Sequence, residues 1–188
     1  MRTFIAIEIG DKVAANIGSL QGEISDCLVG KNPGIKWVDP NLIHLTLKFL
    51  GDVEEDQIED INEIAAQIAE NFNKFTIEVK KVSSFGRPPR VVWLGINVSD
   101  ILGRLQSRVD SRLTKAGFEP DEKKFVGHLT ICRVKDFAVG KQIKRIIKAY
   151  EGFSAGKIQV KSICVYKSEL TKAGPEYTLL SRNELAGA

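Results

Sequence analysis

The sequence predicts an α+β fold with two similar lobes, whose largely antiparallel sheets face a central cleft and carry helices on the outside. Three observations support this fold class. Short stretches of alternating apolar and polar residues, typical of strands, are separated by longer stretches with apolar residues three and four apart, typical of helices. The order helix, strand, helix, strand occurs twice. The two histidines of the chain, His44 and His128, occupy the same tripeptide, His-Leu-Thr, at the same place in each half.

The first half of the chain is expected to begin with a strand over 3–9 and a helix that follows Asp11. One face of that helix is apolar, at Val13, Ile17, Leu20, Ile24 and Leu28. The remaining elements of this half are, in order, a short strand around 35–38, a turn at Asp39-Pro40, a strand over 42–50, a helix over 54–72 and a strand over 75–82.

The second half repeats this order after a strand over 91–96. A helix over 100–116 has one apolar face, at Leu102, Leu105, Val109 and Leu113, and Gly117 is a suitable residue to end it. The remaining elements are a strand over 127–133, a helix that bears Ile143, Ile146, Ile147 and Tyr150, a strand over 158–167 and a strand over 177–181.

Length and composition are typical of one globular domain that spans 1–188. The two lobes would divide it roughly into 1–85 and 86–188, and the pattern is compatible with strands exchanged between them. The three cysteines lie far apart, which argues for a reducing compartment and against a disulfide framework or a zinc site. No apolar run approaches the roughly 18 residues that would span a bilayer. We therefore expect a cytoplasmic, monomeric protein without membrane contact.

The side chains of a strand alternate between its two faces, so His44 and Thr46 point the same way, as do His128 and Thr130. In the strand over 42–50 this alternation also places Lys48 on the face of His44. The opposite face would carry apolar residues toward the core, namely Ile43, Leu45, Leu47 and Phe49.

Two imidazoles brought together across a cleft can serve as a general base and a general acid, because the ordinary pKa of histidine is near neutral. Threonine hydroxyls beside them would donate hydrogen bonds to an anion, and the tetrahedral oxygens of a phosphate can accept from both sides at once. Each histidine alone is more simply explained as a structural residue, and the repeated tripeptide is what favours catalysis. Two histidines without a nearby Cys, Asp or Glu cluster are a poor metal-ligand set, so neither a metal nor a cofactor is expected.

The paired motifs "HLTL" at 44–47 and "HLTI" at 128–131 resemble the signature of the 2H phosphoesterases. Within this superfamily the chain is similar to the bacterial and archaeal RNA 2',3'-cyclic phosphodiesterases, the LigT-like or 2'-5' RNA ligase family. The resemblance covers nearly the whole chain. It includes the segments "RTFIAIEI", "HLTLKFLGD", "FGRPPRVVWLGI", "KFVGHLTICRVK" and "VYKSELTKAGPEY".

The resemblance implies metal-independent opening of a 2',3'-cyclic phosphate at an RNA end to leave a 2'-phosphomonoester. It also implies that His44 is the proton donor to the leaving 3'-oxygen and that His128 is the base that activates water. Thr46 and Thr130 would contact the phosphate, and Arg133 in His-x-Thr-x-x-Arg would be a further phosphate contact.

The basic residues near the motifs, Lys48, Arg87 and Arg90, are candidate contacts for the rest of an RNA strand. The partner would be RNA with a 2',3'-cyclic phosphate or a 2'-5' linked end, such as tRNA halves. Three alternatives stay open at this point. They are a 2'-5' RNA ligase that joins tRNA halves, a phosphodiesterase for a small cyclic nucleotide, and a non-catalytic module that binds RNA ends.

Overall fold

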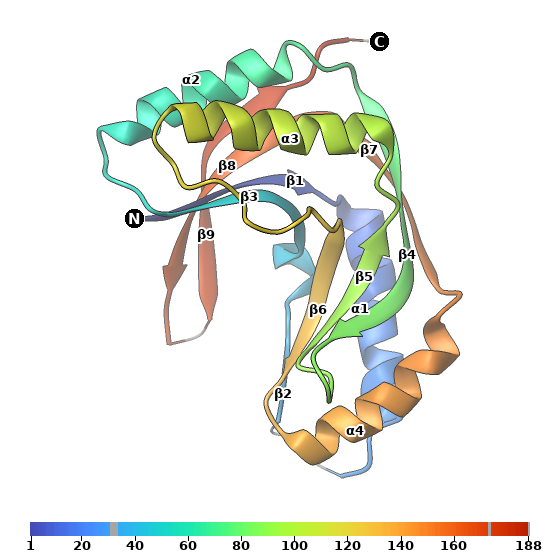
Figure 1. Cartoon of the computed structure of the whole chain (residues 1–188). Helices are drawn as coiled ribbons and strands as arrows, with labels where there is room; N and C mark the ends of the chain where they lie inside the picture. Colours follow the sequence, from blue (N-terminus) through green and yellow to red (C-terminus); the bar gives the residue numbers. More distant parts are fainter. Residues whose placement is uncertain (31–33, 173, 188) are drawn as a thin grey trace.

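Two antiparallel sheets form the centre of the protein (Figure 1). The computed structural model describes residues 1–30, 34–172 and 174–187. The first sheet has the strand order β3 (His44–Asp52), β1 (Arg2–Glu8), β8 (Ser162–Leu170), β9 (Pro175–Glu184). The second sheet has the order β2 (Ile35–Trp37), β6 (His128–Val134), β5 (Val91–Ile96), β4 (Phe75–Phe85), β7 (Ser154–Val160). The predicted α+β class with antiparallel sheets is confirmed.

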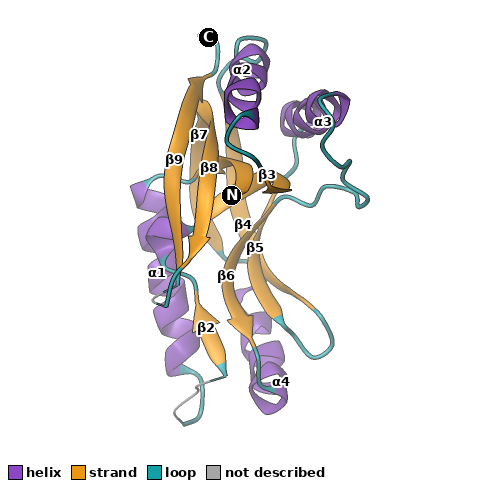
Figure 2. Cartoon of the chain, turned by 90° about the vertical axis from the view of Figure 1, so that its left-hand side faces the viewer, coloured by secondary structure: helices purple, strands orange, loops and turns teal. Residues whose placement is uncertain are grey.

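The helices pack on the outer faces of the sheets (Figure 2). The α-helices are α1 (Asp11–Asp26), α2 (Gln57–Ala69), α3 (Asp100–Lys115) and α4 (Phe137–Ile146), and two short 3-10 helices are η1 (Pro40–Leu42) and η2 (Ile147–Tyr150). The first sheet is covered by α2, which contacts β8 and β9, and by α3, which contacts α2 and β3. The second sheet is covered by α1, which contacts β7, and by α4, which contacts β6.

The two sheets do not divide the chain at residue 85. Each sheet combines strands from both halves, since β1 and β3 pair within one sheet with β8 and β9, while β2 and β4 belong to the other sheet with β5, β6 and β7. The helices cross over as well. The chain leaves β1 in the first sheet to form α1 on the second, and leaves β5 in the second sheet to form α3 on the first. Each histidine strand is therefore supported by a helix that comes from the other sheet.

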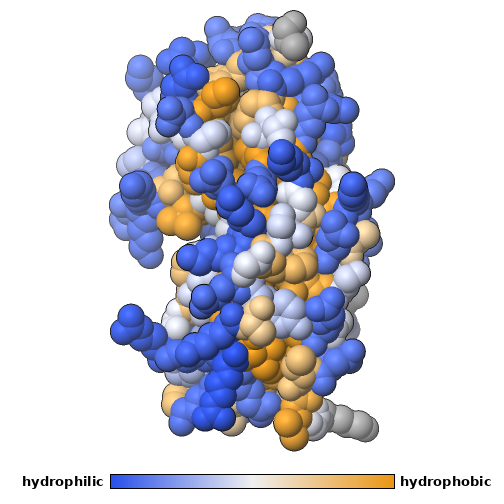
Figure 3. All heavy atoms as spheres, turned by 90° about the vertical axis from the view of Figure 1, so that its right-hand side faces the viewer, coloured by the Kyte–Doolittle hydropathy of each residue, from blue (hydrophilic) through white to orange (hydrophobic). Residues whose placement is uncertain are grey.

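Apolar side chains fill the space between helices and sheets, as the periodicity predicts. On α3 the four predicted core residues, Leu102, Leu105, Val109 and Leu113, are fully buried. The α1 face of Val13, Ile17, Leu20 and Ile24 is buried too. Burial of each such side chain contributes roughly 1.5–3 kcal/mol. Figure 3 shows the side of the molecule that is on the right in Figure 1, where hydrophilic side chains surround smaller apolar areas.

The predicted strand over 158–167 is wrong in one respect, because the chain forms two strands here. β7 ends at Val160 and β8 begins at Ser162, and the two belong to different sheets. The apolar positions change parity at this point, from Ile158 and Val160 to Ile163 and Val165, all of which are buried. That change of parity is the sequence signal of the break at Lys161.

Candidate active site

Both histidine strands contain a β-bulge directly after the His-Leu-Thr tripeptide. On β3, Thr46 is opposite Ala6 and Lys48 is opposite Ile5, so Leu47 is the extra residue. A bulge inserts one residue into one strand of a pair and reverses the alternation of the side chains that follow. The residues after the bulge therefore change faces.

The same irregularity occurs at the corresponding place on β6. Thr130 is opposite Trp93 and Cys132 is opposite Val92, so Ile131 is the extra residue. As a result Cys132 is buried and Arg133 is exposed.

The bulges bring the residues of both strands together in one cleft of about 810 Å³. It is lined by His44, Thr46 and Phe49 from β3 and by His128, Thr130 and Arg133 from β6. The structure thus places all five residues predicted for catalysis and phosphate binding around a single volume. Further lining residues come from β1, β2 and the β8–β9 hairpin, among them Phe4, Trp37, Leu170 and Tyr177.

The two imidazoles are oriented by the same local device. Nδ1 of His44 lies 2.9 Å from the carbonyl oxygen of Leu42, and Nδ1 of His128 lies 2.8 Å from that of Val126. A carbonyl only accepts, so each Nδ1 must carry the hydrogen. Nε2 is then the ring nitrogen left to exchange a proton with a substrate.

His44 is enclosed by aromatic rings. The ring of Phe4 stacks on it with centroids 4.6 Å apart, and Tyr177 meets it edge-on at 5.2 Å. Burial lowers the pKa of His44 below its ordinary value, because the charged imidazolium loses solvation, and the hydrogen bond with the Leu42 carbonyl offsets part of this effect.

His128 is half-buried, as His44 is, but its aromatic neighbours are different residues. Phe85 and Trp93 both meet its ring edge-on, with centroids 5.3 and 6.2 Å away. Sequence analysis missed the aromatic residues around both histidines. Of these residues, Phe4 lies on the strand predicted over 3–9, and its place on that strand was the sequence signal available for it.

The prediction that Lys48 faces the cleft is wrong. Its side chain is fully buried, with Nζ 2.5 Å from Oδ1 of Asp110 and 2.7 Å from the carbonyl oxygen of Glu119. The bulge at Leu47 turns Lys48 toward α3 and turns Phe49, predicted to be in the core, toward the cleft, where it is 69% exposed. Lys48 belongs to a structural ion pair and cannot reach an RNA strand.

Arg87 and Arg90 are exposed in the turn between β4 and β5, and neither lines the cleft. The guanidinium of Arg90 donates through Nη1 to the carbonyl oxygen of Lys135 at 2.7 Å. The structure therefore does not bring these arginines together with the histidines.

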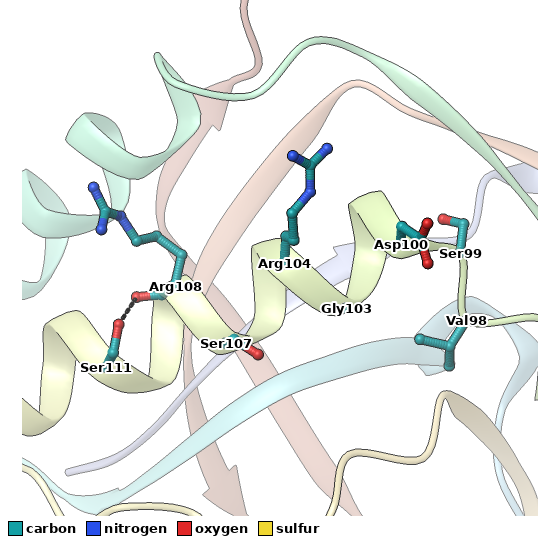
Figure 4. A pocket seen from close by; sticks show the side chains of 8 residues that line it. All are labelled: Val98, Ser99, Asp100, Gly103, Arg104, Ser107, Arg108 and Ser111. Atoms are coloured by element: carbon teal, nitrogen blue, oxygen red, sulfur yellow. Dashed lines mark hydrogen bonds between the residues drawn. The ribbon is translucent and has the colours of Figure 1, made fainter.

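A second depression lies along α3, and Figure 4 shows it with Arg104 and Arg108 projecting from the same side of the helix. Its lining residues are Val98, Ser99, Asp100, Gly103, Arg104, Ser107, Arg108 and Ser111. None of the predicted site residues lies in it. The histidine cleft is the candidate active site.

Two further properties concern only the part of the chain that the structure describes. Within residues 1–30, 34–172 and 174–187, no three His, Cys, Asp or Glu side chains come together in a way that could hold a metal ion. No helix in these same ranges is long and apolar enough to cross a membrane.

The fold and the paired His-x-Thr strands define a phosphoesterase of the two-histidine class. Comparison with known families shows which family within this class the chain belongs to. The family described as "LigT like Phosphoesterase" matches residues 7–93 and 95–177, and the chain belongs to this family.

Relatives from bacteria and archaea are similar over nearly their full length. A protein of Thermotoga maritima named RNA 2',3'-cyclic phosphodiesterase is 35% identical, with 100% of this chain and 97% of the relative covered. A protein of Archaeoglobus fulgidus with the same name is 34% identical, with 94% and 96% covered.

Solved structures have the same fold. A protein of Thermus thermophilus superimposes with a TM-score of 0.81 at 25% identity, and the match covers 100% of this chain and 99% of that protein. LigT of E. coli in complex with 3'-AMP superimposes with a TM-score of 0.79 at 23% identity, with 98% and 97% covered.

Proposed function

We propose that this protein is an RNA 2',3'-cyclic phosphodiesterase, which adds water to a terminal 2',3'-cyclic phosphate and leaves a 2'-phosphomonoester. The observation that carries the proposal is the pair of imidazoles with Nδ1 bound to backbone carbonyls and Nε2 left for the cleft. Relatives that carry this activity in their names are 31–35% identical over most of the chain.

The hydrolysis needs one proton taken and one proton given. His128 takes a proton from water as the water oxygen bonds to phosphorus. The bond between phosphorus and the 3'-oxygen breaks, and His44 gives its Nε2 proton to that oxygen. His128 ends protonated and His44 neutral, and exchange with solvent restores both. No metal ion is needed to balance these steps.

The other cleft residues would hold the phosphate while this occurs. Thr46 and Thr130 line the cleft from the two histidine strands and would donate to its non-bridging oxygens. The guanidinium of Arg133 is fixed on the same strand as His128 and would bind the negative charge with two donors.

Both histidines are half-buried, and each has two aromatic neighbours. The proposal takes His44 as the acid and His128 as the base from the resemblance to the family. With a ribose 5'-hydroxyl in place of the attacking water, the same sequence would join two ends through a 2'-5' linkage and release the 3'-hydroxyl, and its reverse would cleave that linkage. RNA as the partner belongs to this proposal, whereas tRNA halves, the monomeric state and a cytoplasmic location stay predictions.

The test is incubation with an oligoribonucleotide that ends in a 2',3'-cyclic phosphate, in the presence of EDTA. We expect the substrate to gain one water, and the product to match a 2'-phosphate standard and not a 3'-phosphate standard in chromatography and ³¹P NMR. A parallel reaction with a 2',3'-cyclic mononucleotide measures the preference for RNA. No turnover of either substrate would refute the proposal, and turnover of the mononucleotide alone would assign a small-nucleotide phosphodiesterase.

A further inference from the structure

A buried glutamine reaches the bulge of each histidine strand. Gln21 on α1 donates from Nε2 to the carbonyl oxygen of Ile131 at 2.9 Å and to that of Val38 at 2.7 Å. Gln106 on α3 donates from Nε2 to the carbonyl oxygen of Leu47 at 3.4 Å. The two glutamines are 8% and 7% exposed. Each reaches the extra residue of a bulge from the helix that comes over from the other sheet.

Such a residue needs support because a bulge interrupts the ladder of backbone hydrogen bonds. At Ile131 the carbonyl also accepts from the backbone nitrogen of Val38 at 3.0 Å, so Gln21 ties the bulge and the end of β2 to α1 at one point.

The bulge at Ile131 decides where Arg133 points. In a regular strand, Cys132 would share the face of His128 and Arg133 would point into the core. With the extra residue, Cys132 is fully buried and Arg133 lines the cleft. A bulge that slipped by one residue would therefore remove the guanidinium from the phosphate position while His128, which precedes the bulge, kept its place.

We propose that Gln21 is a positioning residue of the active site: by holding the carbonyl of Ile131 it fixes the bulge that keeps Arg133 on the cleft face. The inference rests on the proposed function, because it assigns the phosphate to Arg133. Gln106 has the corresponding place beside the other strand, but the residue that follows that bulge into the cleft is Phe49. Loss of Gln106 should therefore leave Arg133 in position.

The test is a double-mutant cycle between Gln21→Met and Arg133→Ala. Methionine keeps the length of the side chain and suits a helix, but has no donor. We expect Arg133→Ala to weaken binding of inorganic phosphate about 10- to 100-fold, the value of a hydrogen bond to a charged group. Gln21→Met should weaken it to a similar extent, and the double variant should be little worse than either single one. The same pattern is expected in kcat/KM for the cyclic phosphate.

Two variants act as matched controls. Gln106→Met removes the other helix glutamine of similar burial, and its effect should add to that of Arg133→Ala. Asn16→Ala removes another amide of α1, which donates to the carbonyl of Ala155 on β7 at 2.9 Å, away from both histidine strands. It should leave phosphate binding unchanged. Should Gln21→Met fail to fold, Gln21→Asn, which keeps the amide but is too short to span both carbonyls, takes its place in the cycle.

Unchanged phosphate binding in a folded Gln21 variant would overturn the proposal. So would effects of Gln21→Met and Arg133→Ala that simply add, or an equal loss in Asn16→Ala. Phosphate binding by NMR titration needs no turnover, so the two proposals fail separately. A wild-type protein that binds phosphate in the expected pattern but does not open the cyclic phosphate would refute the function and leave Gln21 in its role.

Discussion

The two histidine strands, β3 and β6, have the same construction up to the bulge and different residues after it. Each has a histidine whose Nδ1 is bound two residues back, a threonine on the same face, a bulge and a glutamine at the bulge. After the bulge they diverge. β3 has buried Lys48 and exposed Phe49, whereas β6 has buried Cys132 and exposed Arg133.

The difference shows which parts of a duplicated strand are required by geometry and which are available for chemistry. Aiming an imidazole and a hydroxyl at a shared phosphate needs the same backbone on both sides. A single cation next to the base is enough to hold one negative charge, and the opposite side can then offer an apolar surface. The exposed position after the bulge therefore holds a cation, Arg133, on the strand of His128 and an aromatic ring, Phe49, on the strand of His44.

The largest expected effect is loss of either histidine. His44→Ala and His128→Ala should each lower kcat for the cyclic phosphate by roughly 10²–10⁴, the usual contribution of a general acid or base. Circular dichroism should show that both variants are folded, since both side chains lie at the cleft and not in the core. Near-normal turnover by either folded variant would contradict the assigned pair.

The exposed residues after the bulges should differ in effect, although they occupy corresponding positions. Arg133→Ala should raise the transition-state free energy by about 1.5–3 kcal/mol, because it removes a charge-assisted hydrogen bond to the phosphate. Phe49→Ala removes only apolar surface and should leave inorganic phosphate binding unchanged. Phosphate titration of both variants makes the comparison, and an equal loss in the two would mean that the strands are functionally symmetric.

Much of this arrangement was predictable from local periodicity. The helix faces at Leu102 and Leu113 were predicted because a 3.6-residue repeat is a local property, and the His44 and Thr46 faces because two residues of alternation precede the bulge. The bulges themselves could not be predicted. Lys48 is polar, and its burial depends on Asp110 and Glu119, which lie far away in the sequence. The place of Arg133 in the cleft could be predicted only from the family resemblance, because strict alternation along the strand would point Arg133 away from His128 and into the core.

The two threonines should be nearly equivalent, because they precede the bulges on both strands. Thr46→Ala and Thr130→Ala should each lower kcat/KM by one hydrogen bond to a charged group, at or below the loss in Arg133→Ala. Thr→Ser at the same positions should restore most of the rate, since it keeps the hydroxyl. Thr76→Ala, at an exposed position on β4, is the control. A loss confined to one strand would show that the phosphate is held from one side only.

The smallest effect concerns pH, and it follows the titration of His44. Burial lowers the pKa of His44, so in the free protein it gives up its proton at a lower pH than an exposed histidine does. As the acid, His44 must be protonated while His128 is neutral, so kcat/KM should follow a bell-shaped pH profile with one limb at the lowered pKa of His44. A bound phosphate anion favours the charged imidazole, so the same limb should lie at higher pH in kcat than in kcat/KM.

Phe4→Ala opens the stacked face of His44 to water and should move its pKa back up toward the ordinary value of about 6.5. One limb of the kcat/KM profile should then shift to higher pH while the other stays in place. Phe85→Ala, which removes a ring beside His128, is the matched control and should leave that limb unchanged. If Phe4→Ala left both limbs in place, His44 would not be one of the two groups whose titration controls the reaction.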